Sequence, residues 1–375
     1  MPTHLKKSSY QRYRFIAGLI VFGLLALLTA GATIIPMIPS KQWYIRIFDY
    51  PRLQTFFIAV VAMMWFLVFY FKRTIVGYIL SFVFLGVIVI QAVKAWPYTP
   101  LGKKQVLEVG ENADKKAEIK FVICNVLQYN TNYDKVIAMV NKHNPDVFIT
   151  TESDSVWQRQ LVSLEETFPH RVMVPQSNTY GVHLYSKLPL KDATVRYLVE
   201  KDIPSIRTDL TLRSGQLISL FIVHPRPPVP TESSDSRERD AEIIMVAKEA
   251  RTEKHGVIVA GDFNDVAWSE TTALFQEVSG FLDPRRGRGF YSTFNAKYPI
   301  FRWPLDHIFH SRHFKLVDLK RLEKVGSDHF PMLITLNYVP EQKTDQPKAE
   351  AESDTEEKAN KTIKKGLKDG DSPGE

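Results

Sequence analysis

Three long stretches without a charged side chain constrain this chain more than any other feature of its sequence. They lie at Phe15–Pro39, Leu53–Phe71 and Thr74–Val93, all within the first hundred residues. A helix needs about 20 apolar residues to cross roughly 30 Å of hydrocarbon, and each stretch is near or above that length. A helix also satisfies its own backbone groups in lipid. We therefore expect three transmembrane helices within residues 15–93, after a basic N-terminal segment at residues 1–14.

Two alternatives explain these stretches less well. A cleaved signal peptide would account for the first stretch only, and its small-residue cleavage motif is not clear. Three buried core helices remain the other alternative. The aromatic residues Trp43, Tyr44, Trp96 and Tyr98 lie just outside the stretches, where the interface between lipid and water favours them. The sequence thus predicts a lipid bilayer as a partner.

The basic character of the chain belongs to this membrane region. The sequence has 48 Lys and Arg against 41 Asp and Glu, a net charge of +7. Residues 1–100 hold ten basic residues and one acid, a net charge of +9, while residues 341–375 hold seven lysines and ten acids, −3. Residues 101–340 therefore carry only +1. This weakens a nucleic-acid function, because binding to the phosphate backbone scales with the phosphates neutralised.

The same charges predict an orientation. The basic residues between Lys6 and Arg14 favour a cytoplasmic N-terminus, which places the Lys72-Arg73 loop inside and everything after Val93 outside. Three basic residues between the first and second stretches, and three after the third, oppose this orientation. Because the first helix usually dominates, we expect an integral membrane protein with its C-terminal domain outside the cytoplasm.

The remaining chain divides into a linker, a domain and a tail. Residues 94–118 are polar and charged over most of their length, which is typical of a linker. Residues 341–375 are rich in Lys, Glu, Asp and Ala with almost nothing bulky to bury, so we expect a disordered tail. The domain at residues 119–340 contains the single cysteine, Cys124, which excludes a disulfide scaffold and a cysteine-ligated zinc site.

The pattern of this domain is that of an α/β protein. Ile119–Leu127 is a strand-like apolar run, Tyr133–His143 has helical spacing, and Asp146–Thr150 is strand-like again. A further helical stretch lies at Ser236–Arg251. More strand-like runs lie at residues 182–185, 194–198, 207–212, 217–223, 257–260, 306–310 and 332–336. Many strands and few helices favour a two-sheet sandwich over a single doubly wound sheet.

Polar residues recur at the ends of these strands, where a rigid scaffold holds catalytic groups. They are Asn125, Glu152, His224, Asp262, Asn264, Asp306, Asp328 and His329. Each alone has an ordinary explanation, since Asn and Asp after a strand are common turn formers. Together they supply hard oxygen ligands and two histidines, the set that Mg²⁺-assisted phosphoryl chemistry requires.

In order and spacing these residues resemble the endonuclease/exonuclease/phosphatase superfamily, which has the deoxyribonuclease I-like fold. The resemblance rests on Asn125, Glu152, His224, GDFN (261–264), LDH (305–307) and SDH-x-P (327–331), and covers residues 119–339. His-Pro-x-Pro-Pro (224–228) before an Arg-rich helix also resembles a membrane-anchored bacterial branch. The bacterial plasma membrane as the location is what this resemblance implies. The resemblance implies a four-layered α/β sandwich, two β-sheets flanked by helices, with the active site at the top of the sheets.

The resemblance also implies metal ligands. Glu152 would bind Mg²⁺ directly, with Mn²⁺ as the alternative ion. Asn125 would lie beside it, and Asp328 would complete the shell. Asp262 would position or deprotonate the attacking water, and Asn264 would hold a phosphate oxygen. In-line displacement at phosphorus needs charge neutralisation and a positioned nucleophile more than covalent chemistry, so these roles agree with the reaction.

Two histidines complete the implied machinery. His329 would contact the phosphoryl group in the transition state, with Asp306 accepting its ring N–H and fixing the tautomer. His224 would stabilise the second face of the phosphate or assist the leaving group. The sequence leaves open which residue is the general base, because a paired acid and histidine can exchange that role.

Two further histidines and four arginines lie near these motifs. His307 should face away from its neighbour Asp306 on a strand, so we expect a structural role, and for His183 we favour packing over a place in the cleft. The expected substrate-binding residues are Arg285, Arg286, Arg288 and Arg302, which are interleaved with aromatic residues. A mobile loop with solvated arginines is the alternative.

Three functions remain open. The first is a membrane-tethered phosphomonoesterase or phosphodiesterase acting on a phosphate ester or pyrophosphate, either lipid-linked or small, outside the cytoplasm. The second is a membrane-tethered endonuclease or exonuclease, supported by the basic and aromatic residues at 285–303. The third is a catalytically silent receptor or adaptor domain, which the complete set of catalytic elements disfavours.

Overall fold

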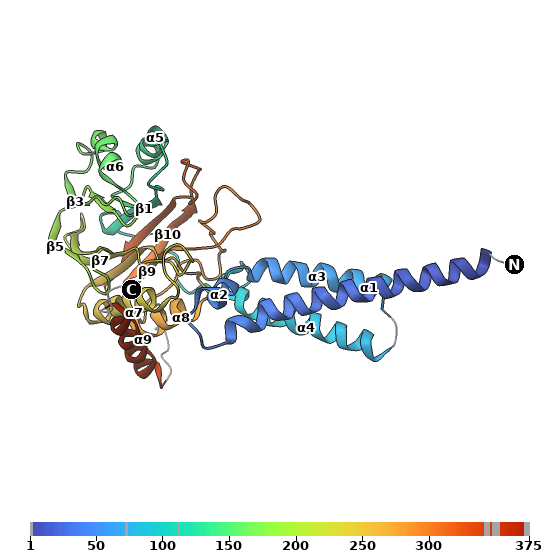
Figure 1. The fold of residues 1–375 in the computed structure, drawn as a ribbon. Helices are drawn as coiled ribbons and strands as arrows, with labels where there is room; N and C mark the ends of the chain where they lie inside the picture. The colour runs from blue at the N-terminus through green and yellow to red at the C-terminus, as the bar shows by residue number, and fades with distance from the viewer. Residues whose placement is uncertain (1–2, 72–73, 112, 341–345, 347–352, 371–375) are drawn as a thin grey trace. The chain divides into compact units, whose positions relative to one another are not determined.

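The computed structural model describes residues 3–71, 74–111, 113–340, 346 and 353–370 (Figure 1). The chain divides into two compact units, residues 1–97 and residues 98–375. Lys72 and Arg73, on which the predicted orientation partly depends, lie outside the described residues, as does most of residues 341–352.

The first unit is helical. Its long helices are α1 (Thr3–Ile34), α3 (Arg52–Phe69) and α4 (Ile75–Ala95), with a short α2 (Trp43–Arg46) between the first two. All three long helices are long and apolar enough to cross a membrane. They pack through buried aromatic residues that include Phe22, Phe66 and Phe84, while most of their apolar surface is exposed. The prediction of three membrane-length helices is confirmed.

The loop between α1 and α3 holds a buried ionic cluster. Asp49 accepts hydrogen bonds from Arg46, at 3.2 Å, and from Arg52, at 2.8 Å. Arg52 also donates to Gln91 of α4, which in turn donates to Thr33 of α1 at 2.9 Å. Buried charges are costly unless they are paired, so this cluster fixes the loop against two helices and neutralises part of the loop's positive charge.

The second unit contains the eleven described strands and the remaining helices. Its elements are η4 (Lys115–Ala117), β1 (Glu118–Asn125), α5 (Tyr133–His143), β2 (Val147–Thr151), α6 (Ser155–Gln160), η5 (Val162–Leu164), β3 (His170–Val174), β4 (Val182–Ser186), β5 (Leu190–Arg196), β6 (Ser205–Thr211), β7 (Leu217–Val223), α7 (Arg237–Thr252), β8 (Gly256–Asp262), α8 (Glu270–Ser279), β9 (Asp306–His310), β10 (Phe314–Arg321), β11 (Met332–Tyr338) and α9 (Thr355–Gly370).

The strands form two mixed sheets. One has the order β10-β11-β1-β2-β4-β3, and the other has the order β5-β6-β7-β8-β9. Each sheet contains one parallel pair, β1 with β2 and β7 with β8. The carboxyl ends of a parallel pair meet at the same edge of the sheet. The residues that follow β1, β2, β7 and β8 are therefore brought to defined edges.

Alternation of side chains along the strands builds four layers (Figure 1). Ile119, Phe121 and Ile123 of β1 point into the core between the sheets, which Leu220 of β7 and Ile258 of β8 enter from the other side. The intervening residues of the first sheet pack under α5 and α6. Those of the second sheet pack under α7, α8 and α9. The predicted α/β sandwich flanked by helices is confirmed.

The predicted linker is largely part of the second unit. Tyr98 is buried and its hydroxyl donates to the carbonyl of Ala267 at 2.5 Å. Val106 lies in the core between the sheets, and the N–H of Val109 donates to the carbonyl of Leu316. The sequence prediction of a linker over residues 94–118 rested on polarity, and it missed these few apolar anchors.

The prediction of a disordered tail is wrong for residues 355–370, which form the helix α9. Ala359 is fully buried and Ile363 packs against the same cluster on α7 and α8. Gly366 lies so close to α7 that an added Cβ would meet the Cβ of Ala241 at 2.4 Å. Small side chains let the two helices approach closely, so little bulky apolar surface was needed to dock α9, and the composition did not reveal it.

Candidate active site

Two carboxylates face each other because of strand register. Asp262 is the last residue of β8 and Asp306 is the first residue of β9, and the antiparallel pairing of these strands puts them directly opposite each other. Both side chains are buried. Cross-strand partners lie about 4.5–5.5 Å apart at Cβ, so two negative charges would repel each other strongly without a cation between or beside them.

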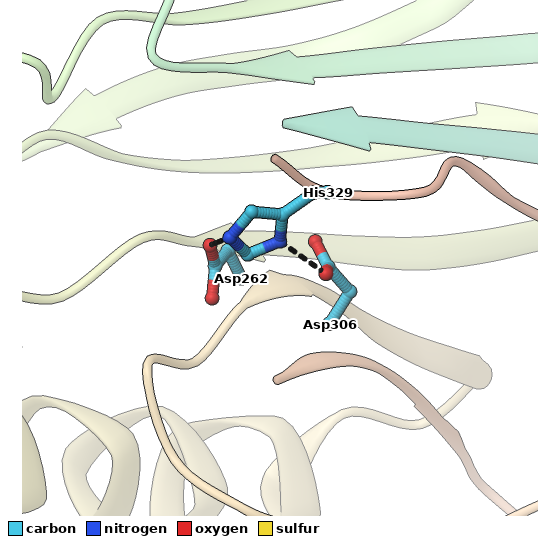
Figure 2. A group of neighbouring side chains, drawn as sticks. All are labelled: Asp262, Asp306 and His329. Carbon is cyan, nitrogen blue, oxygen red and sulfur yellow. Dashed lines mark hydrogen bonds and ion pairs between the residues drawn. The ribbon is translucent and has the colours of Figure 1, made fainter. Parts of the chain in front are cut away.

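His329 supplies that cation (Figure 2). Its Nδ1 lies 2.7 Å from Oδ2 of Asp306, and its Nε2 lies 3.6 Å from Oδ2 of Asp262. Burial opposes a charged ring, but Asp306 and Asp262 outweigh it and raise the pKa of His329 to about 10. His329 is therefore an imidazolium at neutral pH.

Asn125 links the two sheets at this point. It ends β1, and its Nδ2 donates to Oε1 of Glu152 at 2.7 Å and to Oδ2 of Asp262 at 3.0 Å. Its Oδ1 accepts from the N–H of Leu127 at 3.0 Å, which fixes the amide orientation. One amide therefore holds a carboxylate from each sheet.

Glu152 directly follows β2, and its backbone has a φ of 57°. This left-handed conformation is uncommon for a residue with a side chain and is typical of functional sites. Burial raises the pKa of Glu152 to about 7, with the hydrogen bond from Asn125 acting in the opposite direction. Within the described residues no Lys or Arg contacts its carboxylate.

The lack of a described Lys or Arg at the Glu152 carboxylate raises the question of whether these residues fit a divalent cation. Hard ions such as Mg²⁺ prefer carboxylate and amide oxygens, which Glu152 and Asn125 offer. Asp328 is half-buried and its charge acts on both Glu152 and His329. A cation would remove the cost of the partly buried Glu152 charge, so the residues present fit the metal that the resemblance implies.

The structure offers a second possible metal position. Ligand atoms of Asp262, Asp306 and His329 lie within 4.8 Å of one another. Both ring nitrogens of His329 already face carboxylates, and a charged imidazolium has no lone pair to give a metal. We therefore favour the position at Glu152 and assign Asp262, His329 and Asp306 to hydrogen bonding.

His224 and Asn264 lie beside the carboxylate of Asp262. His224 directly follows β7 and is buried beside the ring of Tyr180. Burial lowers the pKa of His224 to about 4, so it is neutral at pH 7. Asn264 has a φ of 51°, its N–H donates to Oδ1 of Asp262, and its Nδ2 donates to the carbonyl of Pro225.

Burial raises the pKa of the Asp262 carboxyl, but the nearby His329 and His224 outweigh this effect and the pKa is lowered overall. For Asp306, burial dominates and the pKa is raised, although His329 opposes the shift. Asp262 is thus the carboxylate of the pair that stays ionised more readily. It is also the one that faces Nε2 of His329 and Nδ2 of Asn125.

The structure does not support substrate binding by Arg285. Its side chain is fully buried, donates to both carboxylate oxygens of Asp283, and contacts Nδ1 of His307 at 2.7 Å. His307 also contacts the carbonyl of Asp265 and stacks on Phe309. The expected structural role of His307 agrees with this packing, and Arg285 belongs to the same support beneath the site.

The neighbouring arginines also hold the scaffold. Arg286 lies with its guanidinium over the ring of Tyr98. Arg288 donates to the carbonyls of Val106 and Pro284. The sequence placed both near substrate because arginines beside aromatic residues are typical of anion binding, but these contacts tie residues 98–108 to the domain instead.

Arg302 lies next to residues 327–331, the catalytic segment that contains His329. Its guanidinium lies over the ring of Phe330, as do the cationic groups of Arg321 and Lys324, at 5.0, 4.3 and 5.8 Å from the centroid. The sequence analysis missed Arg321 and Lys324. Nothing in their local sequence marks them, since only the fold brings the end of β10 beside residue 302.

Several other supporting residues were not identified from the sequence. Thr293 is buried and its hydroxyl accepts from the N–H of Asp306 at 3.3 Å. Arg239 of α7 donates to the carbonyl of Asn264 at 2.7 Å and pairs with Asp265. Arg239 lies on the helix that precedes the GDFN strand, and this position in the sequence was a usable signal. No motif surrounds Thr293, so nothing in its sequence context marks it.

An aromatic stack leads from the surface to His329. The ring of Phe294 lies 5.0 Å from that of His329 and 6.0 Å from that of Trp303.

His183 is completely buried on β4 against Tyr185, and burial lowers its pKa to about 4. Packing, as favoured for His183 from the sequence, describes its position.

Comparisons with known proteins agree with this site. A model of the Endonuclease/Exonuclease/phosphatase family matches residues 125–329, from Asn125 to His329. No curated protein sequence matches the chain.

Solved structures are similar to the catalytic domain. Zebrafish TDP2 complexed with a single-strand DNA product is 17% identical and covers 59% of this chain and 99% of its own, with a TM-score of 0.49. The human Nocturnin catalytic domain is 16% identical, covers 60% of this chain and 96% of its own, and has a TM-score of 0.48. An endonuclease/exonuclease/phosphatase from Beutenbergia cavernae is 13% identical, covers 60% and 72%, and has a TM-score of 0.48.

Asp306→Asn tests the charge on His329. An asparagine oxygen can still accept from Nδ1, but the negative charge is lost, so the pKa of His329 should fall. In the native chain the pKa is raised from 6.5 to about 10, so this pair stabilises the fold below pH 6.5 and loses its effect as pH rises through 10. The variant should lose less stability across that window in metal-free thermal melts, with Asp318→Asn as the control. An unchanged pH profile would contradict the assignment.

Proposed function

Because the chain belongs to the endonuclease/exonuclease/phosphatase family, we propose that it is a membrane-anchored, Mg²⁺-dependent phosphoesterase that hydrolyses a lipid-linked phosphate ester or pyrophosphate outside the cytoplasm. The observation that carries this proposal is the charged His329, held between Asp262 and Asp306 beside the partly buried Glu152. The family is one of metal-dependent phosphoester hydrolases, and the membrane anchoring and substrate are the parts we add.

The geometry supports the following roles for the residues at the proposed phosphate site. Glu152, with Asn125 and Asp328 beside it, would hold the Mg²⁺ ion, which would neutralise charge on the phosphate when bound. Asp262 is the ionised carboxylate that positions the attacking water and accepts its proton. His329 is already protonated, so it acts as a donor to the phosphoryl oxygens, and Asp306 keeps it oriented.

His224 and Asn264 act on the same phosphate without a change in charge. His224 is neutral at pH 7 because of its burial, and it donates a hydrogen bond to the phosphate or to the leaving oxygen. Asn264 holds a phosphate oxygen, from a turn that Asp262, Pro225 and Arg239 fix in place. The phosphate thereby meets donors on more than one face.

The membrane helices favour a lipid-linked substrate. Three helices of spanning length precede the domain, and residues 101–340 carry a net charge of only +1. An enzyme held at a bilayer meets lipid substrates at high local concentration, whereas a nuclease benefits from a strongly basic surface. A bacterial plasma membrane is the location we infer from the same helices.

Nuclease activity is the second candidate. The stack of Trp303 on Phe294, which reaches His329, offers a platform on which a base could stack. The cations of Arg302, Arg321 and Lys324 would attract a nucleic-acid backbone. A silent receptor or adaptor is disfavoured, because a site with no catalytic role has no need to bury three carboxylates around one imidazolium.

Hydrolysis assays distinguish these candidates. The detergent-solubilised full chain should release phosphate or a headgroup from phospholipids or polyprenyl pyrophosphates with Mg²⁺, and EDTA should abolish this activity. Asp262→Ala should lower the rate by about 10²–10⁴-fold, as expected for loss of a general base. Turnover of DNA or RNA alone would overturn the lipid proposal. Turnover of no substrate by the native chain would favour the silent domain.

Reporter fusions test the orientation. The N-terminal charges favour a domain outside the cytoplasm, and the pairing of Arg46 and Arg52 with Asp49 reduces the opposing positive charge of the first loop. A periplasmic reporter fused after Gly370 should therefore be active, and a cytoplasmic reporter at the same point inactive. The reverse pattern would place the catalytic domain in the cytoplasm.

A further inference from the structure

A short hairpin beside the active site carries exposed apolar side chains. This hairpin, residues 294–303, closes where the N–H of Phe294 donates to the carbonyl of Trp303 at 3.0 Å. At its tip, Tyr298 is 62% exposed, Ile300 72% and Phe301 54%. Among the described residues 98–370, no other four-residue stretch exposes three large hydrophobic side chains. Soluble domains rarely expose clustered apolar groups without a binding role.

The hairpin tip is ordered by its own hydrogen bonds. Oδ1 of Asn295 accepts from the N–H groups of Lys297 and Tyr298, at 2.7 and 3.3 Å. The N–H of Asn295 donates to the carbonyl of Phe301 at 2.9 Å, and that of Phe301 donates to Tyr298 at 3.2 Å. The apolar side chains are therefore displayed on a defined turn and do not lie on an unstructured loop.

Cations lie on this hairpin and beside its base. Lys297 is exposed on the hairpin itself, and the groups of Arg302, Arg321 and Lys324 gather on the ring of Phe330. Burial, and after it the positive charge of Arg302, lowers the pKa of Arg321. Within the part of the chain that the structure describes, none of the four pairs with a carboxylate. Apolar and aromatic residues ringed by cations match an anionic lipid surface.

The hairpin is also tied to the catalytic segment. The N–H of Ala296 donates to the carbonyl of Asp328 at 2.6 Å, and the N–H of Phe330 donates to that of Thr293 at 2.9 Å. The ring of Phe294 contacts that of His329. A partner that binds the hairpin therefore also fixes Asp328 and Phe330, the residues on either side of His329.

The covalent connection to the membrane helices is short. Only Trp96 and Pro97 separate Ala95, the end of α4, from Tyr98, which is buried in the catalytic domain. Three extended residue steps span about 10 Å at most. If α4 crosses the bilayer, the catalytic domain cannot move far from the lipid surface.

We propose that hairpin 294–303 docks into the surface of an anionic phospholipid bilayer, with Tyr298, Ile300 and Phe301 among the headgroups and acyl chains and the cations of Lys297, Arg302, Arg321 and Lys324 on lipid phosphates. A docked hairpin would hold the residues on either side of His329 next to the headgroup layer. This proposal rests on the proposed membrane anchoring, and it extends the proposed function by naming the surface through which a lipid substrate enters.

Site-specific labelling of the full chain tests this proposal without any need for turnover. The only cysteine, Cys124, is completely buried, so Ile300→Cys provides a single reactive thiol. A fluorophore on it should be quenched by brominated acyl chains after reconstitution into vesicles of phosphatidylcholine and phosphatidylglycerol. The same label on Val162→Cys or Tyr197→Cys, both exposed in the native chain, should not be quenched.

A second arm tests the cations. With Arg302→Gln, Arg321→Gln and Lys324→Gln combined, quenching at position 300 should fall severalfold in phosphatidylglycerol vesicles and stay unchanged in pure phosphatidylcholine. Equal quenching at all three labelled positions, or a label at 300 that is as accessible to water as the controls, would overturn the proposal. A chain that hydrolyses a lipid without docking would overturn this inference and leave the proposed function intact.

Discussion

The site depends on burying several carboxylates with very few cations. Asp262 and Asp306 are buried and Glu152 is partly buried at the edge of the sandwich, where an unbalanced negative charge is expensive. His329 balances the second and third of them and is forced into its charged form. Glu152 keeps a raised pKa, and this residual cost is the physical reason to expect a divalent metal there.

The two sheets make this concentration of charge possible. Asp262 and Asp306 come from one sheet, while Asn125 and Glu152 come from the other. The apolar core between the sheets fixes their separation, and the amide of Asn125 joins them. Neither sheet alone could hold the set, so catalysis depends on the packing of residues such as Phe121 that never touch substrate.

Much of this architecture could be predicted from the sequence, because its signals are local. Uncharged runs marked the long helices, and polar residues at strand ends marked the side chains that meet at the candidate site. The predictions that failed concern residues whose positions depend on contacts far apart in the sequence. Arg285 has the sequence context of an anion-binding residue, but Asp283 and His307 enclose it. The composition of helix α9 is typical of disordered segments, but the helix packs on α7 because the two backbones approach closely at Gly366.

Calorimetric titration of Mn²⁺ into the metal-free full chain distinguishes a metal at Glu152 from a metal at His329. Native protein should bind the ion, Glu152→Gln should lose this binding, and His329→Gln should retain it. A chain in which Glu152→Gln binds Mn²⁺ like the native protein, while His329→Gln does not, would contradict the account. That result would place the metal among Asp262, Asp306 and His329 and remove the charged imidazolium on which the mechanism rests.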